Sequence, residues 1–160
     1  MPKTTAINNR RYLGNKYKLL PFITSVVHDH CHDVRVVADL FAGTGAVSSA
    51  FQDRQLITND LLFSNYISNY AWFGSEDYRA EYVENQIETY NGLQDVLDNY
   101  MSLNFADTFF SSLDCRKIGF IREDIEQQFR EGRINLREYS LLITSLLYAM
   151  DKNCEDVWAL

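Results

Sequence analysis

Two aspartates and a pair of glycines form the most chemically suggestive group in the sequence. Asp39 opens the segment Asp-Leu-Phe-Ala-Gly-Thr-Gly, in which Gly43 and Gly45 let the backbone turn tightly and leave room for a ligand. A helix starting after the turn would offer unpaired N–H groups to a carboxylate, and Asp39 can accept from a cationic amino group. A purely structural glycine turn of an α/β protein is the alternative interpretation.

Asp60 is the second carboxylate, and it lies 21 residues after Asp39. A ribose-binding acid is expected about 20 residues beyond a glycine-rich turn, because the ends of neighbouring parallel strands face one crevice. Asp60 could instead cap a helix. A nicotinamide-type fingerprint would need a third glycine at position 48, where Ser48 stands, so a nicotinamide or other nucleotide cofactor is the weaker alternative.

The segment Tyr12-Leu-Gly-Asn-Lys16 precedes the first expected helix. Gly14 permits a turn there. Lys16 lies near a helix start, where the helix dipole does not favour a cation, so a ligand or a phosphate explains this charge better.

These residues need elements that position them, and the first 60 residues predict a βαβ unit preceded by a helix. The expected elements are a helix over 18–32, a buried strand over 34–38, a helix over 46–52 and a strand over 55–58. Asp39 and Asp60 then follow the two strands. We expect residues 1–60 to form the cofactor-binding part of an α/β fold.

Residues 61–160 predict a helical region that folds as one unit with the first 60 residues. Apolar periodicity indicates helices over 62–73, 78–101, 105–111 and 118–130. Gly132 is placed to end the fourth of these helices. Asn135 and Glu138 have the spacing of a capping box for a last helix through Met150.

Composition favours a globular, cytoplasmic protein without a membrane span. Of the 160 residues, 46% are hydrophobic and 23% charged, the net charge is −7, and no apolar run approaches membrane-spanning length. The three cysteines are scattered, and the consecutive ligands from His28 to His32 suit a metal site poorly, so no metal is expected. The first 18 residues carry no acid, which is compatible with DNA contact through five cations: Lys3, Arg10, Arg11, Lys16 and Lys18.

The order of these segments resembles the Dam-like family of adenine-specific DNA methyltransferases, over about residues 10 to 152. The resemblance implies a partial Rossmann-like S-adenosylmethionine-dependent methyltransferase core with a large helical insert, and a complete enzyme that acts on double-stranded DNA in restriction–modification. It implies S-adenosyl-L-methionine as cofactor, with a pocket formed by Tyr12, Gly14, Lys16, Asp39, Phe41, Gly43, Gly45 and Asp60.

The sequence departs from that family at the transfer motif. The family carries Asp/Asn-Pro-Pro-Tyr/Phe after the helical insert, whereas the only prolines here are Pro2 and Pro21. No catalytic residue is therefore assigned. We expect a cofactor-binding N-terminal part that is inactive alone, through truncation, as a fragment, or because a second chain supplies the catalytic half. The alternative is a non-catalytic regulatory or assembly subunit that pairs with a second chain.

Overall fold

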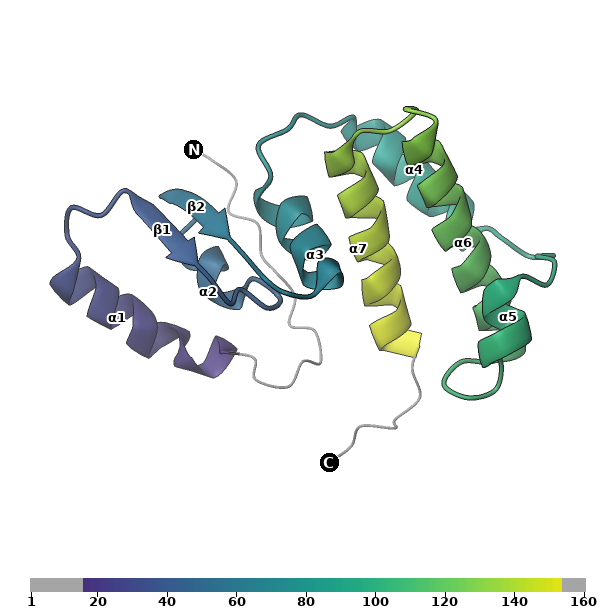
Figure 1. The fold of residues 1–160 in the computed structure, drawn as a ribbon, viewed down its shortest axis with the longest axis horizontal. Helices are drawn as coiled ribbons and strands as arrows, with labels where there is room; N and C mark the ends of the chain where they lie inside the picture. The colour runs from purple at the N-terminus through teal and green to yellow at the C-terminus, as the bar shows by residue number, and fades with distance from the viewer. Residues whose placement is uncertain (1–15, 154–160) are drawn as a thin grey trace. The chain divides into compact units, whose positions relative to one another are not determined.

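The computed structural model describes residues 16–153, which fall into two compact units, one ending at Ser75 and the other beginning at Glu76. Each unit is described by itself. The first contains η1 (Tyr17–Leu19), α1 (Leu20–His30), β1 (Val36–Asp39), α2 (Ala46–Ser49), β2 (Gln55–Thr58) and α3 (Phe63–Phe73) (Figure 1). The sequence placed a boundary after residue 60, whereas α3 here belongs with the strands. That the chain folds as one unit remains a prediction.

The two strands pair in parallel, with Val36 opposite Gln55 and Asp39 opposite Thr58. The chain is therefore a mixed α/β protein with a small parallel sheet, and the α/β prediction is confirmed at this level. β2 has its predicted bounds, β1 begins two residues later than expected, and α2 is only one turn long. Parallel pairing requires a crossover, which here consists of the turn after β1, α2 and a second turn through Phe51–Arg54.

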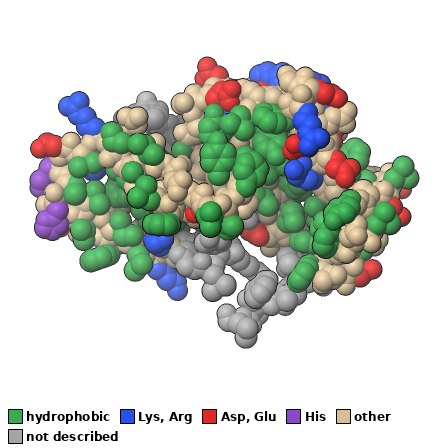
Figure 2. All heavy atoms as spheres, in the orientation of Figure 1, with side chains coloured by type: hydrophobic (Ala, Val, Ile, Leu, Met, Phe, Trp, Pro, Cys, Tyr) green, Lys and Arg blue, Asp and Glu red, His purple; other side chains and the backbone are tan. Residues whose placement is uncertain are grey.

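One face of this sheet is much more exposed than the other. Val36, Ala38 and Ile57 alternate with the half-buried Val37 and Leu56, as the two-residue period of a strand requires. Hydrophobic side chains also reach the surface along α1, near the histidines at its end (Figure 2). A strand pair of a parallel sheet is normally covered on both faces, so the apolar surface of this unit is unusually open.

The second unit is helical and consists of α4 (Ala80–Asn91), α5 (Tyr100–Phe105), α6 (Ser112–Arg130) and α7 (Leu136–Asn153) (Figure 1). α7 packs against α4 and α6, and α5 packs against α6. Their core includes Val83, Cys115, Ile125 and Leu142, all buried. Within the described ranges, no helix is both long enough and apolar enough to cross a membrane.

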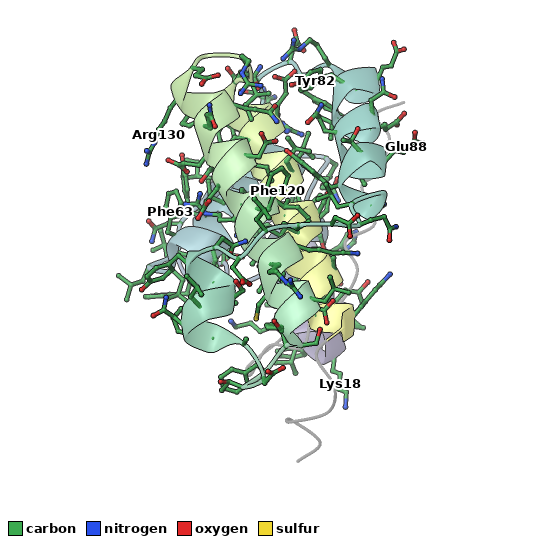
Figure 3. The ribbon with its side chains drawn as sticks, turned by 90° about the vertical axis from the view of Figure 1, so that its right-hand side faces the viewer. Lys18, Phe63, Tyr82, Glu88, Phe120 and Arg130 are labelled. Carbon is green, nitrogen blue, oxygen red and sulfur yellow. The ribbon has the colours of Figure 1, made fainter. Side chains whose placement is uncertain are left out.

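A buried polar network joins α4 to α6. Gln128 is 2% exposed, and its Nε2 lies within hydrogen-bond distance of three acceptors, in Gln86, Tyr90 and Asp124. Its Oε1 accepts from the hydroxyl of Tyr82. Burial raises the pKa of the Tyr90 hydroxyl, and its 2.6 Å bond to Asp124 raises it further. Figure 3 shows the two helices, with Tyr82 labelled on α4 and Arg130 on α6. Hydrogen bonds of this kind fix which residues of the two helices face each other.

Three of the predicted helices of this unit differ from the structure. α6 begins at Ser112, six residues before its predicted start, and the other two differ for local reasons. The helix expected over 78–101 is interrupted at Gly92, and α5 restarts at Asn99, whose side chain accepts from the backbone N–H groups of Met101 and Ser102. The helix expected over 105–111 does not form. Asp107 has a φ of 59° and its N–H donates to the carbonyl of Phe110, so this segment is a tight turn.

The corner between α6 and α7 is confirmed as predicted. Gly132 has a φ of 68°, and the N–H of Arg133 donates to the carbonyl of Gln128, which is the pattern of a Schellman helix end. Asn135 Oδ1 accepts from the N–H of Glu138 at 2.9 Å, and Glu138 accepts from the N–H of Asn135 at 3.0 Å. These two reciprocal bonds are the capping box that starts α7.

Candidate functional site

The candidate site is the turn between β1 and α2, where the chain leaves the sheet at Asp39. Gly43 and Gly45 have φ values of 54° and 84°, a region that residues with a Cβ rarely adopt. The N–H of Ala42 donates to the carbonyl of Asn59 at 3.0 Å, so the turn is hydrogen-bonded to the segment that follows β2. The predicted requirement for glycine at both positions is explained by these angles.

Asp39 is half-buried at the end of β1. Its Oδ2 accepts from the hydroxyl of Ser48 at 3.0 Å, and Ser48 is completely buried. The residue that interrupts the nicotinamide fingerprint therefore holds the first carboxylate in place. Within the described part of the chain, Ser48 is the one side chain that hydrogen-bonds to Asp39, and Oδ1 retains its capacity to accept.

Asp60 lies two residues after β2 and accepts three internal hydrogen bonds. Gly43 N–H donates to Oδ2 at 2.8 Å, and Leu62 N–H and Asn65 Nδ2 each donate to Oδ1 at 3.0 Å. Burial opposes the ionised form, but the bonds from Leu62, Asn65 and Gly43 outweigh it and lower the pKa of Asp60. A carboxylate offers about four acceptor sites, and these donors together with the backbone N–H of Leu61 use most of them. Asp60 thus bonds to the N–H of Leu62, the residue before α3, but α3 has no side-chain cap hydrogen bond.

Two asparagines of α3, which the sequence analysis did not single out, complete a closed ring with the turn. Asn69 Nδ2 donates to the carbonyl of Gly43 at 2.9 Å and to that of Asn65 at 2.8 Å. Asn65 in turn donates to Asp60, which accepts from Gly43. Both asparagines are 2% exposed. Their spacing of four residues on the expected helix over 62–73 was the available signal, since buried amides need partners.

The other predicted pocket residues differ in how the structure places them. Phe41, in the turn, is 81% exposed. Gly45 is buried, and a Cβ there would lie 2.8 Å from Asn69 Oδ1 and 3.0 Å from Phe73 Cε2, so its missing side chain makes room for α3. Lys16 is exposed just before η1. Tyr12 and Gly14 lie outside the described residues, as do three of the five N-terminal cations.

The histidine-rich end of α1 is not organised as a metal site. His28 contacts the neighbouring Asp29 at 3.3 Å and packs edge-on against the ring of His32. Over residues 16–153, no three His, Cys, Asp or Glu side chains are grouped to hold an ion.

The geometry brings four predicted residues to one edge of the sheet. Asp39 is the last residue of β1 and Asp60 follows the adjacent parallel strand β2, and the N–H of Gly43 is bonded to Asp60. Phe41 stands exposed beside them. This edge of the sheet therefore offers two carboxylates, an exposed aromatic ring and a glycine backbone without side chains. Such a set can bind a ligand that has hydroxyl groups, a cationic amine and a flat ring.

Comparison with known proteins shows the family. The model of the D12 class N6 adenine-specific DNA methyltransferases matches residues 12–155. The chain belongs to this family, which confirms the resemblance drawn from the order of the motifs. No solved structure matches it significantly.

The relatives are modification methylases of bacteria. The chain is 34% identical to "Modification methylase LlaI" of Lactococcus lactis subsp. lactis, over 89% of this chain and 25% of that protein. It is 29% identical to "Modification methylase StsI" of Streptococcus sanguinis, over 88% and 24%. It is 27% identical to "Type II methyltransferase M.NlaIII" of Neisseria lactamica, over 88% and 45%. The chain thus spans about a quarter of the first two relatives and less than half of the third.

Proposed function

We propose that this chain supplies the S-adenosyl-L-methionine-binding turn of a DNA adenine methyltransferase of the restriction–modification type. The observation that carries the proposal is the placement of Asp39 and Asp60 at the ends of adjacent parallel strands, on either side of a turn with two glycines at positive φ. Family membership supplies the class of cofactor and of substrate. A Rossmann-like core, of which the two strands would be part, belongs to the same proposal.

Each residue of the proposed pocket has a role that fits its surroundings. Asp39 accepts from the amino group of the cofactor, for which its Oδ1 has capacity. Asp60 accepts from the ribose through what acceptor capacity its internal donors leave. Phe41 packs against the adenine ring of the cofactor. Tyr12, Gly14 and Lys16 approach from the N-terminal segment.

The adenine of the DNA would be held by residues outside this sequence. Methyl transfer to an exocyclic amine requires acceptors in fixed geometry and an aromatic ring that stacks on the extruded base. The Pro-Pro motif that provides them in the family is absent from these 160 residues. In this proposal the chain binds cofactor weakly, because the far wall of the pocket is missing, and it needs a further segment or a second chain for activity.

Calorimetry with S-adenosylhomocysteine tests the proposal. We expect a dissociation constant on the order of micromolar or weaker, because little of the ligand is enclosed. Phe41→Ala should weaken binding by about tenfold while leaving the fold intact, since the ring is mostly exposed. Leu97→Ala is the matched control, because Leu97 is 86% exposed and lies in the helical unit. NAD should not compete. Nanomolar affinity, or equal effects of the two variants, would contradict the proposal.

A second candidate is a non-catalytic subunit that pairs with another chain. It is favoured by the exposed apolar residues of the first unit, among them Val36, Leu40 and Ile57 at 44%, 59% and 52% exposure. Native mass spectrometry distinguishes the two, since a stable complex that binds no S-adenosylhomocysteine would favour the subunit.

A further inference from the structure

Asn69, which contacts the turn after β1, is a buried polar residue at a position where an apolar side chain would pack equally well. It lies in the interior of α3 and is 2% exposed, between the apolar core residues Ile67 and Ala71. Its Oδ1 is buried without a hydrogen-bond donor among the residues described. A buried acceptor without a donor costs free energy, and leucine would fill the same space without that cost. The contribution of Asn69 to the structure therefore comes from the hydrogen bonds that its amide nitrogen donates.

That nitrogen connects the helix to the turn. The Nδ2 group of Asn69 faces two carbonyl oxygens, those of Gly43 and Asn65, at 2.9 and 2.8 Å. Since both partners can only accept, the orientation of the amide is fixed by its contacts. The peptide groups of Gly43 are thus held on both sides, with Asp60 on the N–H and Asn69 on the C=O.

The same side chain also limits what can stand at the second glycine. A Cβ at position 45 would lie 2.8 Å from Asn69 Oδ1, closer than real Cβ contacts come. The turn and α3 are fitted together by hydrogen bonds at Gly43 and by steric exclusion at Gly45. Both constraints act on the segment that, in the proposed function, lies against the cofactor.

We infer that Asn69 is a positioning residue for the cofactor turn: it holds the Gly43 carbonyl so that the turn keeps its shape with or without ligand. This inference rests on the proposed function for the identity of the ligand, whereas the bracing of Gly43 does not depend on it. A preformed turn reduces the ordering cost of binding, so loss of Asn69 should lower affinity through a residue that does not touch the ligand.

Two measurements on Asn69→Ala in the full chain test the inference. Hydrogen exchange of the Gly43 amide, followed by NMR without ligand, should become about tenfold faster, equivalent to about 1.4 kcal/mol. Calorimetry well below the melting temperature should show binding of S-adenosylhomocysteine weakened by about tenfold. The control is Ile67→Val, which shortens a completely buried side chain of the same helix without removing a hydrogen bond.

The outcomes separate bracing from general loosening. Faster exchange and weaker binding in Asn69→Ala, beyond those in Ile67→Val, support the inference. Unchanged Gly43 exchange, equal effects of the two variants, or faster exchange with unchanged affinity overturns it. If the wild-type chain binds no S-adenosylhomocysteine, the proposed function fails, and the exchange rate of the Gly43 amide alone decides the bracing role.

A second variant covers the case in which Asn69→Ala does not fold. Asn69→Leu removes the same amide nitrogen but fills the space with an apolar side chain, so the surroundings of Ile67 and Ala71 stay packed. Exchange of the Gly43 amide should rise as in Asn69→Ala, because the Gly43 carbonyl loses the same donor. Unchanged exchange in this variant overturns the inference as well.

Discussion

The backbone N–H of Gly43 donates to the carboxylate of Asp60 at 2.8 Å, across seventeen residues of chain. The bond ties the turn after β1 to the first residues after β2. Asp60 therefore stabilises the fold in addition to any contact with a ligand. Unfolding and ligand-binding experiments can measure the two roles separately.

Asp60→Ala should lower the free energy of unfolding by about 1–3 kcal/mol, because three donors lose a charged acceptor and water replaces it only in part. Urea denaturation followed by circular dichroism measures the loss. Asp53→Ala is the control in the same unit, since the Asp53 side chain is 77% exposed and pairs with Arg54 only at 3.9 Å. An Asp60→Ala chain as stable as wild type would make Asp60 a ligand group alone.

Glu138 should make the helical unit sensitive to acid. The Arg79 guanidinium, bonded at 2.7 and 2.8 Å, lowers the pKa of this buried carboxyl to about 2, against the opposing effect of burial. A lowered folded-state pKa stabilises the protein above the ordinary value of 4.5, and the gain is lost as pH falls from there towards 2. The full shift corresponds to about 3 kcal/mol, which we reduce to about 2 because the Arg79 side chain is 58% exposed.

Urea denaturation of Glu138→Gln and wild type at several pH values checks this dependence. The variant should be less stable at pH 7, and the difference should shrink as pH falls below about 4.5. Glu123→Gln removes one charge from an exposed position of α6 and serves as control. A stability difference that stays constant down to pH 2.5 would show that the ion pair is not its source.

Gly119→Ala should destabilise the protein by about 1–3 kcal/mol even though alanine favours helices, because a Cβ at this position of α6 would overlap the side-chain amide of Asn99. Asn99 cannot easily move, since it bonds to the carbonyl of Arg116 and caps α5. Gly92→Ala is the comparison, because the nearest atom to its Cβ would be the Thr89 carbonyl oxygen at 3.5 Å. Thermal denaturation should show a lower melting temperature for the first variant and little change for the second.

The 160-residue chain alone should not methylate DNA, because the residues that hold an extruded adenine are not in its sequence. Incubation with tritiated S-adenosyl-L-methionine and duplex DNA of mixed sequence measures incorporation. A parallel reaction should include a polypeptide carrying the Asp/Asn-Pro-Pro-Tyr/Phe motif of a relative. Methyl incorporation by the chain without that addition would overturn this part of the proposal.

The sequence was sufficient where local chemistry decides the structure. β2 was predicted at its observed bounds, since a short apolar run is closed there by Asn59 and Asp60. The capping box of Asn135 and Glu138 follows from residue types three positions apart. The residues between the strands likewise predict parallel pairing, which places Asp39 and Asp60 at one edge of the sheet.

The sequence was insufficient where distant residues decide the structure. Apolar residues after Gly92 continued a helical pattern, and nothing local showed that Asn99 would cap a new helix and bond to Arg116 in α6. The buried role of Gly45 could not be separated from a ligand-facing one, because it depends on Asn69 and Phe73 of a later helix. Hydrogen bonds that span 26 residues, such as that from Asn69 to Gly43, have no local pattern.

The compact corner between α6 and α7 has a consequence for the order of folding. The bonds that cap its two helices join residues at most five positions apart, such as Arg133 to Gln128 and Glu138 to Asn135, so closing them restricts little chain. The bond from Arg79 to Glu138 spans 59 residues, so it can form only after α4 has packed against α7. We expect the α6–α7 hairpin to be the early nucleus of the helical unit, with α4 docking onto a carboxylate that the hairpin has already oriented.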